Sequence, residues 1–362
     1  MSEADFCCDE GAYLAHVAQR ARERAVRSPV RKENKTVDLK AVQIGGRIFQ
    51  RLALTKAEIR KTKTAKSYLV VTLSDGSAEL QGNIWDWQGA LPQLGAYEVD
   101  ASIGEYQGRK QLNNIKMYLS DNQDMSAFSV RYTDDVAYYE KRFAELLANV
   151  ADTPCRHIVE DMYAAVGDAY KAASSAASMH HVGASGNLVH TCEVAEMAKV
   201  LAVAAQSYGY NVNVSLCIAG ALVHDIGKIY TYALNGPVVD ITLDGTLADH
   251  IALGVRLLWS TASAKQNRNI AALLEHIILS HHGKQEYGSP VTPKFMEAYI
   301  VNTADSLSAT LATVQSFNQK AVDERRPGKT TERIYPLGNT MHLLQSTVVE
   351  MLTGTYDVAP LP

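Results

Sequence analysis

The residues most able to do chemistry lie in one apolar stretch, CIAGALVHDIGKIY, at positions 217–230. Its alanines, leucines and isoleucines recur at helical spacing and predict a buried helix that ends near His224 and Asp225. Lys228 follows one turn later, so a helix would place it on the same face as that pair. Burial of three ionisable groups is costly unless they are paired or bound to a metal. A divalent ion would compensate for the aspartate, and the lysine would attract an anionic substrate such as a phosphate.

Further histidines and a late aspartate could complete such a metal site. Eight of the eleven histidines fall between positions 180 and 282, near the ends of predicted helices or just beyond them. Imidazole and carboxylate groups together suit borderline divalent ions such as Mn, Fe, Zn or Ni. In chain order the candidates are His180, His181, His190, His224, Asp225, His250, His276, His281, His282 and Asp305.

The order of these residues resembles the HD-domain metal-dependent phosphohydrolases. The similarity rests on HDIGK at 224–228, HHG at 281–283, a histidine between those motifs, and the aspartate of NTADSLSA. With TKTAKSYLVVTLSDGSAELQGNIWD, HHVGASGNLVHT and ILSHHGKQEYGSP included, the chain resembles the YhaM-type 3′-5′ exoribonucleases over roughly residues 36–320. In that family an OB-fold precedes the HD domain, and single-stranded RNA or DNA is trimmed from its 3′ end with Mn²⁺.

The resemblance implies a role for each residue of the set. A first metal ion would be held by His190, His224, Asp225 and Asp305, and a second by His250, His281 and His282, with Asp225 bridging the two. Mn²⁺ is favoured, with Fe, Mg or another divalent ion as alternatives. A metal-activated water would attack the terminal phosphodiester, and Lys228 would steady the phosphate charge, so Asp225 and Lys228 are the candidate catalytic residues. One departure is Val189, which stands where the family has a glutamate, so an outer carboxylate is expected to be missing.

Basic residues are concentrated toward the N-terminus. Positions 20–66 hold 15 Lys or Arg and 4 Asp or Glu, although the net charge of the chain is only −4. This asymmetry indicates a polyanionic partner for the N-terminal part, the alternative being a solvated basic face without a ligand. Residues 1–35 are predicted to form a basic helical extension, with a helix over 11–27 and a breaker at Ser28-Pro29.

A change of pattern near residue 36 predicts a different kind of structure. Six short alternating segments, separated by turn residues, are typical of strands, and Asp75-Gly76 is typical of a hairpin turn. They are VDLKAVQI, RIFQRLALT, SYLVVTL, AELQGNIW, AYEVDASI and KQLNNIKMYL. Short strands joined by a long basic loop favour a small Greek-key barrel, an OB-fold, over residues 36–122.

Helical spacing dominates the rest of the chain. From about residue 134 alanine and leucine recur with a helical period, interrupted by an extended piece near 236–242. We expect a helical domain over 123–325 and a C-terminal tail over 326–362, with one more helix in MHLLQSTVVEML. The predicted fold class is α+β multidomain, with an N-terminal OB-like β-barrel followed by an all-α HD domain.

A few residues outside the metal set are candidates for contact with nucleic acid. A basic loop of the barrel is expected to contact phosphates, and a histidine beside the metal set would line the substrate path, with a plain loop role as its alternative. These candidates are Lys61, Lys63, Lys66 and His181. Trp85 and Trp87 could stack on bases, but strand aromatics more often belong to a core. His276 is expected to be structural or to support a metal ligand from behind.

Together these features predict a metal-dependent 3′-5′ exoribonuclease that acts on single-stranded RNA, or on single-stranded DNA, and releases nucleoside 5′-monophosphates. One alternative is an HD-type phosphohydrolase of a nucleotide or cyclic dinucleotide, against which the basic barrel argues. Another is a single-strand-binding protein with a regulatory HD domain, against which the complete ligand set argues. The start of the chain lacks a signal-peptide pattern, no apolar run could span a membrane, and the five cysteines show no disulfide framework, so we expect a cytoplasmic protein. The resemblance also implies a homo-oligomer.

Overall fold

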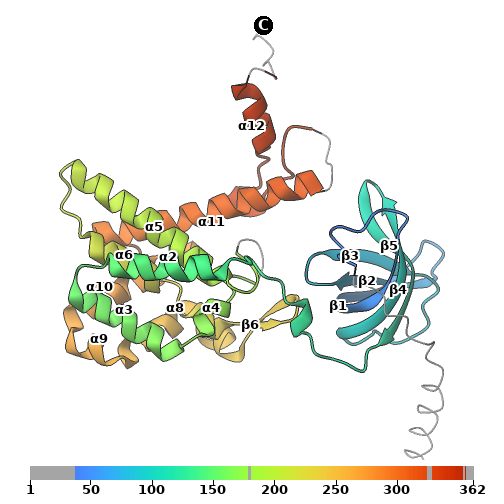
Figure 1. Ribbon diagram of the computed structural model, residues 1–362, viewed down its shortest axis with the longest axis horizontal. Coiled ribbons are helices and arrows are strands. Elements are labelled where there is room, and N and C mark those ends of the chain that lie inside the picture. Colours follow the sequence, from blue (N-terminus) through green and yellow to red (C-terminus); the bar gives the residue numbers. More distant parts are fainter. Residues whose placement is uncertain (1–36, 178–180, 324–327, 354, 356–362) are drawn as a thin grey trace, which may run out of the picture. The chain divides into compact units, whose positions relative to one another are not determined.

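The computed structural model describes residues 37–177, 181–323, 328–353 and 355. These residues form a five-stranded barrel followed in the chain by a helical domain, which confirms the predicted α+β fold class (Figure 1). The helix predicted at 11–27 and the candidate His180 lie outside the described residues. None of the described helices is both long enough and apolar enough to cross a membrane.

The barrel closes in the strand order β1-β2-β3-β5-β4, an order that fits an OB-like fold. Its first strand pairs with two neighbouring strands: residues 47–54 pair with β4 and residues 53–61 pair with β2. A register shift between Leu54 and Lys56 occurs where the strand changes partner. Alternate apolar side chains, such as Ile48 and Leu52, fill the interior. The strands are β1 (Arg47–Lys61), β2 (Ser67–Ser74), β3 (Glu79–Ile84), β4 (Gly95–Tyr106) and β5 (Arg109–Leu119).

The segment 37–44, predicted as a strand, is a turn, so the prediction of six strands is wrong by one. The N–H groups of Ala41 and Val42 both donate to the Asp38 carbonyl oxygen, at 3.1 and 2.9 Å, and such local bonds cannot form a sheet ladder. The Leu39 N–H donates to the Asp75 carboxylate at 2.7 Å. The Leu39 side chain is fully buried in the barrel core. The alternation of VDLK was therefore misleading, because of its residues only Leu39 is fully buried in the barrel core.

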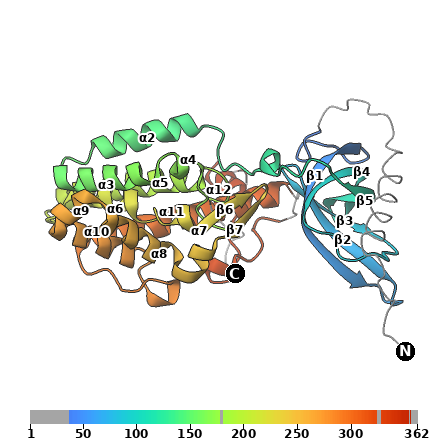
Figure 2. The same cartoon turned by 90° about the horizontal axis from the view of Figure 1, so that it is seen from below.

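The helical domain is built around α6 (Val214–Val223), in which every residue from position 216 onward is buried. A helix that is apolar on all sides must be surrounded by others, and α6 packs against α3, α5, α10 and α11 (Figure 2). The other helices are α2 (Val136–Ala148), α3 (Thr153–Val166), α4 (Ala169–Ala172), α5 (Gly186–Ser207), α7 (Lys228–Thr231), α8 (Leu243–Ser260), α9 (Ala262–Gln266), α10 (Arg268–Ser280), α11 (Met296–Asp323) and α12 (Gln345–Leu352). Short 3-10 turns occur at Ser126–Phe128, Gln285–Tyr287 and Tyr335–Leu337.

A small hairpin interrupts the helices. Strand β6 (Tyr232–Asn235) pairs with β7 (Val238–Ile241) around Gly236, whose φ of +60° suits glycine. The extended piece near 236–242 was predicted, whereas its partner strand was not, because four residues carry too little alternation to recognise. The domain is thus helical except for this hairpin. The helix predicted within 341–352 is present as α12.

Candidate metal centre

The predicted metal ligands come from segments that lie far apart in the sequence. Four of them follow directly after helices, and three lie within helices. They are His190 in α5, His224 and Asp225 after α6, His250 in α8, His281 and His282 after α10, and Asp305 in α11. Helices α5, α10 and α11 pack against α6, and α8 packs against α7 and α10, so all seven residues come to one place.

The HDIGK stretch is a tight turn that follows the end of α6, and the sequence predicted that this helix would end here. Helix α6 ends at Val223, and α7 begins at Lys228. Gly227, between them, allows α8 to approach closely, because a Cβ there would lie 1.9 Å from the His250 carbonyl oxygen. Lys228 still meets Asp225, with 2.7 Å between Nζ and Oδ2. The glycine of the motif thus lets the helix that carries His250 pack against the turn.

Asp225 lies at the centre of the cluster and faces two pairs of histidines. Its Oδ2 is 3.3 Å from Nε2 of both His190 and His224. Its Oδ1 is 3.4 Å from Nε2 of His281 and 3.5 Å from Nε2 of His250. A single carboxylate therefore presents a separate oxygen to each pair.

Two overlapping sets of side chains could each hold a metal ion. Within each set the candidate ligand atoms lie within 4.8 Å of one another. The sets are His190, His224 and Asp225, and Asp225, His250, His281 and His282. Asp305 adds a second carboxylate beside the first set, since its Oδ1 is 3.1 Å from His190 Nε2.

Each of the five rings is oriented by a hydrogen bond at Nδ1. The partners of His224, His281 and His282 are backbone carbonyl oxygens, which can only accept, so Nδ1 carries the proton and Nε2 keeps its lone pair. The partner of His190 is a hydroxyl group and that of His250 is a carboxylate. In chain order the partners are Ser308 at 3.1 Å, Ala221 at 2.7 Å, Asp249 at 2.6 Å, Ile278 at 2.7 Å and Tyr287 at 2.9 Å.

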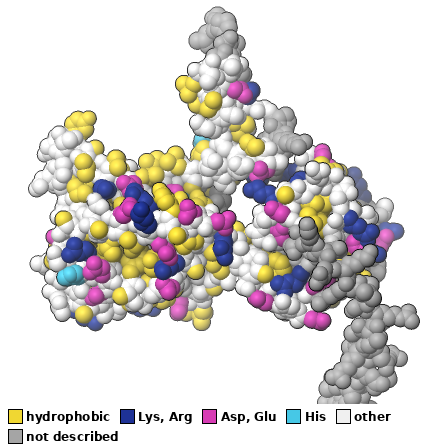
Figure 3. All heavy atoms as spheres, viewed as in Figure 1, with side chains coloured by type: hydrophobic (Ala, Val, Ile, Leu, Met, Phe, Trp, Pro, Cys, Tyr) yellow, Lys and Arg dark blue, Asp and Glu magenta, His cyan; other side chains and the backbone are white. Residues whose placement is uncertain are grey.

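The buried atoms at the centre fit a bound divalent cation. Asp225 Oδ1, His250 Nε2 and His281 Nε2 are buried and make no hydrogen bond within the described structure. Such unsatisfied atoms are costly unless a ligand engages them. The face drawn in Figure 3 shows only small patches of histidine. His250, His281 and Asp225 are themselves buried. Neutral imidazole and carboxylate are ligands for Mn, Fe and Zn, so the donor set suits such a metal.

The electrostatics of the centre also favour a cation. Burial alone would raise the pKa of Asp225, but the Lys228 ammonium and the His224 ring outweigh it and hold that pKa well below its usual range. At His190 burial would lower the pKa, yet the Asp225 and Asp305 carboxylates raise it to about 9. Two buried carboxylates thus hold a proton on His190, for which a metal ion would compete.

Asp249 supports His250 and was not predicted from the sequence. It interrupts α8 with φ +56° and ψ 165°, a backbone conformation that is rare for residues other than glycine. Its carboxylate accepts hydrogen bonds from both the N–H and the Nδ1–H of His250, each at 2.6 Å, which lowers the Asp249 pKa to about 2. A carboxylate behind a metal-ligating histidine fixes the ring and raises its basicity. The signal that could have revealed it is its position directly before a predicted ligand.

Because Val189 replaces a glutamate, an outer carboxylate was expected to be missing from this helix. Glu193 on the same helix supplies one. It lies one turn after His190, and its Oε2 accepts from Ser308 Oγ at 2.7 Å. Ser308 in turn accepts from His190 Nδ1 at 3.1 Å. The same Glu193 oxygen lies 3.1 Å from His181 Nε2. His190 is therefore backed by a hydroxyl and a carboxylate that spacing alone did not reveal.

The other candidate residues occupy different surroundings. The lysines predicted to contact phosphate are exposed at the end of β1 and in the loop to β2; they are Lys61, Lys63 and Lys66. His181 is only 1% exposed, and its ring faces Glu193, so its contact with nucleic acid stays a prediction. Nε2 of His276 accepts from the Lys294 backbone N–H at 3.1 Å, an interaction typical of a structural histidine.

The chain was compared with protein families and with solved structures. The HD domain family matches residues 187–310, a segment that contains all seven candidate ligands. None of the solved structures matches the chain. Residues 187–310 are therefore an HD domain, and HD domains are a family of metal-dependent phosphohydrolases. An HD domain after an N-terminal barrel is confirmed, whereas the finer resemblance to exoribonucleases stays a prediction.

Proposed function

We propose that the protein is a 3′-5′ exoribonuclease that hydrolyses single-stranded RNA to nucleoside 5′-monophosphates. The observation that carries this proposal is the placement of Asp225 between two histidine pairs, one facing each carboxylate oxygen at 3.3–3.5 Å. Two divalent ions bound about 3.5–4 Å apart are the usual arrangement for in-line displacement at phosphorus. A carboxylate that offers one oxygen to each side can be shared by such a pair.

The residues of the chain would hold two ions, for which we favour Mn²⁺. Asp225 would bridge them, with Asp305 on the side of His190 and with His282 on the side of His250. When bound, such ions lower the pKa of a coordinated water and neutralise phosphoryl oxygens. Asp249 would keep the His250 lone pair directed at its ion, and Ser308 would do the same for His190. We propose that Asp225 and Lys228 are the residues on which the reaction depends most.

Lys228 would neutralise charge on the substrate phosphate. Its ammonium group is almost fully buried and lies 2.7 Å from Asp225 Oδ2 and 3.5 Å from Ser175 Oγ. A buried cation interacts strongly with a charge that grows in the transition state, because water does not screen it. The phosphoryl group would leave with the terminal nucleotide, and the proton would go to the 3′ oxygen of the shortened strand.

The enclosure of the centre supports removal of terminal nucleotides over internal cutting. The side chains of His190, His224, Asp225 and His281 are at most 1% exposed, whereas that of Asp305 is 12% exposed. A strand end can enter such an enclosed site more readily than the middle of a strand, which must both enter and leave it, or than a duplex, which is wider. This favours a single-stranded substrate, with single-stranded DNA as the alternative to RNA.

The barrel would supply the binding surface for that strand. The exposed lysines of the β1–β2 loop, Lys61, Lys63 and Lys66, would contact phosphates, as basic loops of strand-binding barrels do. A small nucleotide would need no such module, which disfavours the nucleotide-hydrolase alternative. We also expect self-association of the chain, as the resemblance implies.

The proposal is tested with a 5′-labelled single-stranded RNA, Mn²⁺ and the purified protein. Wild type should give a ladder that shortens from the 3′ end, and Asp225→Ala should leave the RNA intact. Asp244→Asn is the matched control, because Asp244 is an exposed carboxylate in the first turn of α8 and should keep full activity. Intact RNA in every reaction, with the strand still bound, would refute the exonuclease and favour a binding protein.

A further inference from the structure

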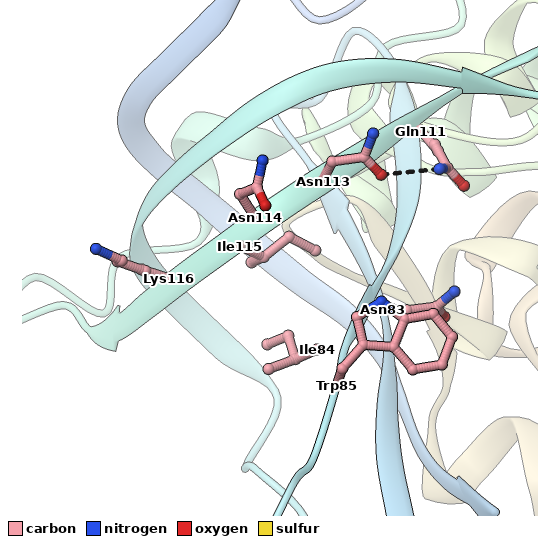
Figure 4. Close-up of a pocket in the computed structure, with 8 residues that line it drawn as sticks. All are labelled: Asn83, Ile84, Trp85, Gln111, Asn113, Asn114, Ile115 and Lys116. Atoms are coloured by element: carbon pink, nitrogen blue, oxygen red, sulfur yellow. Dashed lines mark hydrogen bonds between the residues drawn. The ribbon is translucent and has the colours of Figure 1, made fainter. Parts of the chain in front are cut away.

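A cleft on the barrel lies between β3 and β5, outside the HD domain. It encloses about 570 Å³, a size typical of small-ligand sites. Figure 4 shows its walls, which carry side chains from the end of β3 on one side and from β5 on the other. Amides and one indole dominate the lining: Asn83, Trp85, Gln111, Asn113, Asn114 and, at one end, Lys116. No carboxylate lines the cleft, so nothing in it would repel a polyanion.

The cleft exists because β3 and β5 meet at a single point and then separate. These strands are parallel and pair only at Gly82 and Leu112. A Cβ at Gly82 would lie 2.4 Å from both the Leu112 carbonyl oxygen and Ile115 Cδ1, so only glycine permits this approach. Beyond Gly82 the two strands are not hydrogen-bonded to each other, and Ile84 and Ile115 line the space between them.

A bulge in β5 directs two successive amides outward. Leu112 and Ile115 are both buried although they lie three residues apart, a spacing that a regular strand cannot give. The pairing with β4 shifts between Asp100 and Ser102, and Asn114 has φ +54°. Bulges of this kind re-aim side chains and are common beside functional sites. Asn113 and Asn114 therefore both line the cleft.

A second glycine leaves room for one of these amides. A Cβ at Gly104 on β4 would lie 2.0 Å from Asn113 Nδ2. The Asn113 Oδ1 accepts from Gln111 Nε2 at 2.8 Å, so the two amides are held in a fixed mutual orientation (Figure 4). Paired amides that present donors and acceptors in a fixed order are the groups that read the edge of a nucleobase.

Trp85 provides the flat surface that base recognition requires. Its side chain is 61% exposed, and its ring lies against Tyr68 at 4.9 Å between centroids, tilted by 31°. Trp87, by contrast, is packed partly against the barrel core. An exposed indole supported from behind by a second ring can stack on a base with little loss of side-chain freedom.

We infer that this cleft binds an unpaired nucleobase of the single-stranded substrate, which stacks on Trp85 while the amides of Asn113 and Gln111 read its edge. The cleft would give the enzyme a preference among bases, whereas the β1–β2 lysines would bind every sequence alike. This inference rests on the proposed function, because it takes single-stranded nucleic acid as the ligand.

The test is a binding titration of the full chain with labelled rA, rC and rU homopolymers in the presence of a chelator, so that no strand is cut. Trp85→Ala should weaken binding about 5- to 150-fold, which corresponds to about 1–3 kcal/mol for one stacked base. Trp85→Phe should restore most of the affinity. Tyr118→Ala, which removes a similarly exposed ring from β5 outside the cleft, should leave binding unchanged.

Base preference is tested separately with Gly104→Ala. The added methyl group should displace the Asn113 amide and make the affinities for the three homopolymers more alike, without loss of the stacking contribution. Gln81→Ala is the amide control, since Gln81 is exposed on β3 and does not line the cleft. Unchanged binding by both Trp85→Ala and Gly104→Ala would overturn the inference. The inference would also be overturned if a free nucleoside monophosphate bound in the cleft without changing the affinity of the protein for the single strand.

Failure of this inference can be told apart from failure of the proposed function. If the cleft variants bind RNA normally and the wild type still shortens RNA from its 3′ end, only the role of the cleft is wrong. If Trp85→Ala weakens binding but the wild type with Mn²⁺ cuts nothing, the cleft binds strands and the nuclease proposal is wrong.

Discussion

The pair formed by Asp225 and Lys228 gives the sharpest prediction about stability. Lys228 is 6% exposed and its Nζ lies 2.7 Å from Asp225 Oδ2, so the lysine is a buried cation that depends on one close carboxylate. Asp225→Asn keeps the shape of the side chain and removes its charge. In metal-free protein this change should leave the ammonium group buried without its partner.

The size of the effect follows from that burial. Loss of one partner of a buried ion pair costs about 3–5 kcal/mol, most of it the penalty for the charge that stays behind. Asp225→Asn should therefore lower the free energy of unfolding of the helical domain by roughly 3 kcal/mol or more. The double variant Asp225→Asn, Lys228→Met should recover most of this loss, because it leaves neither charge in the interior.

The assay is urea unfolding in chelator, followed by the fluorescence of Trp259 in α8. The chain has three tryptophans, so a Trp85→Phe, Trp87→Phe background makes Trp259 the only reporter. Asp244→Asn serves as the control for loss of an exposed carboxylate. The reasoning is refuted if Asp225→Asn is as stable as its parent, or if the double variant is no more stable than the single one.

Three further predictions concern metal affinity, pH and salt. Asp249→Asn should weaken Mn²⁺ binding about 10- to 100-fold by calorimetry, because the carboxylate no longer orients His250; equal affinity would contradict that role. In metal-free protein the raised pKa of His190 means that protonation of this ring stabilises the folded state. That stabilisation is complete below about pH 6.5 and is lost as the pH rises through about 9. The stability should thus fall by up to about 3 kcal/mol over that range, and a His190→Gln variant that falls equally would exclude this histidine as the cause. Lys63→Ser should weaken the binding of every homopolymer alike. If the lysine contacts one phosphate, the change should also reduce the slope of log K against log salt by about 0.7. An unchanged slope would show that Lys63 does not contact the strand.

The types and order of the metal ligands could be predicted from the sequence, because only partners or a metal make buried histidines and aspartates tolerable. The backbone geometry of the motif could not. The apolar spacing predicted the end of the helix near His224 and Asp225, but it did not predict the turn at Gly227 that lets α8 approach. That turn depends on a contact with a distant helix, about which local spacing carries no information.

The supporting residues were missed for a similar reason. Glu193 and Ser308 are separated by more than a hundred positions and meet only after α5 and α11 have packed. Asp249 is adjacent to its partner, but its left-handed backbone cannot be read from residue type. In the barrel, the alternation of 37–44 was typical of a strand, whereas Asp38 favours a local turn there.

The most direct test of the central claim is hydrolysis of a single-stranded RNA by the Mn²⁺-loaded enzyme in water enriched in oxygen-18, with the products identified by mass spectrometry. We expect nucleoside 5′-monophosphates, each carrying one heavy oxygen on its phosphate, from wild type and none from Asp225→Ala. Cyclic phosphates, 3′-phosphates or unlabelled mononucleotides would contradict water attack at this centre, and an absence of any product would contradict the exonuclease itself.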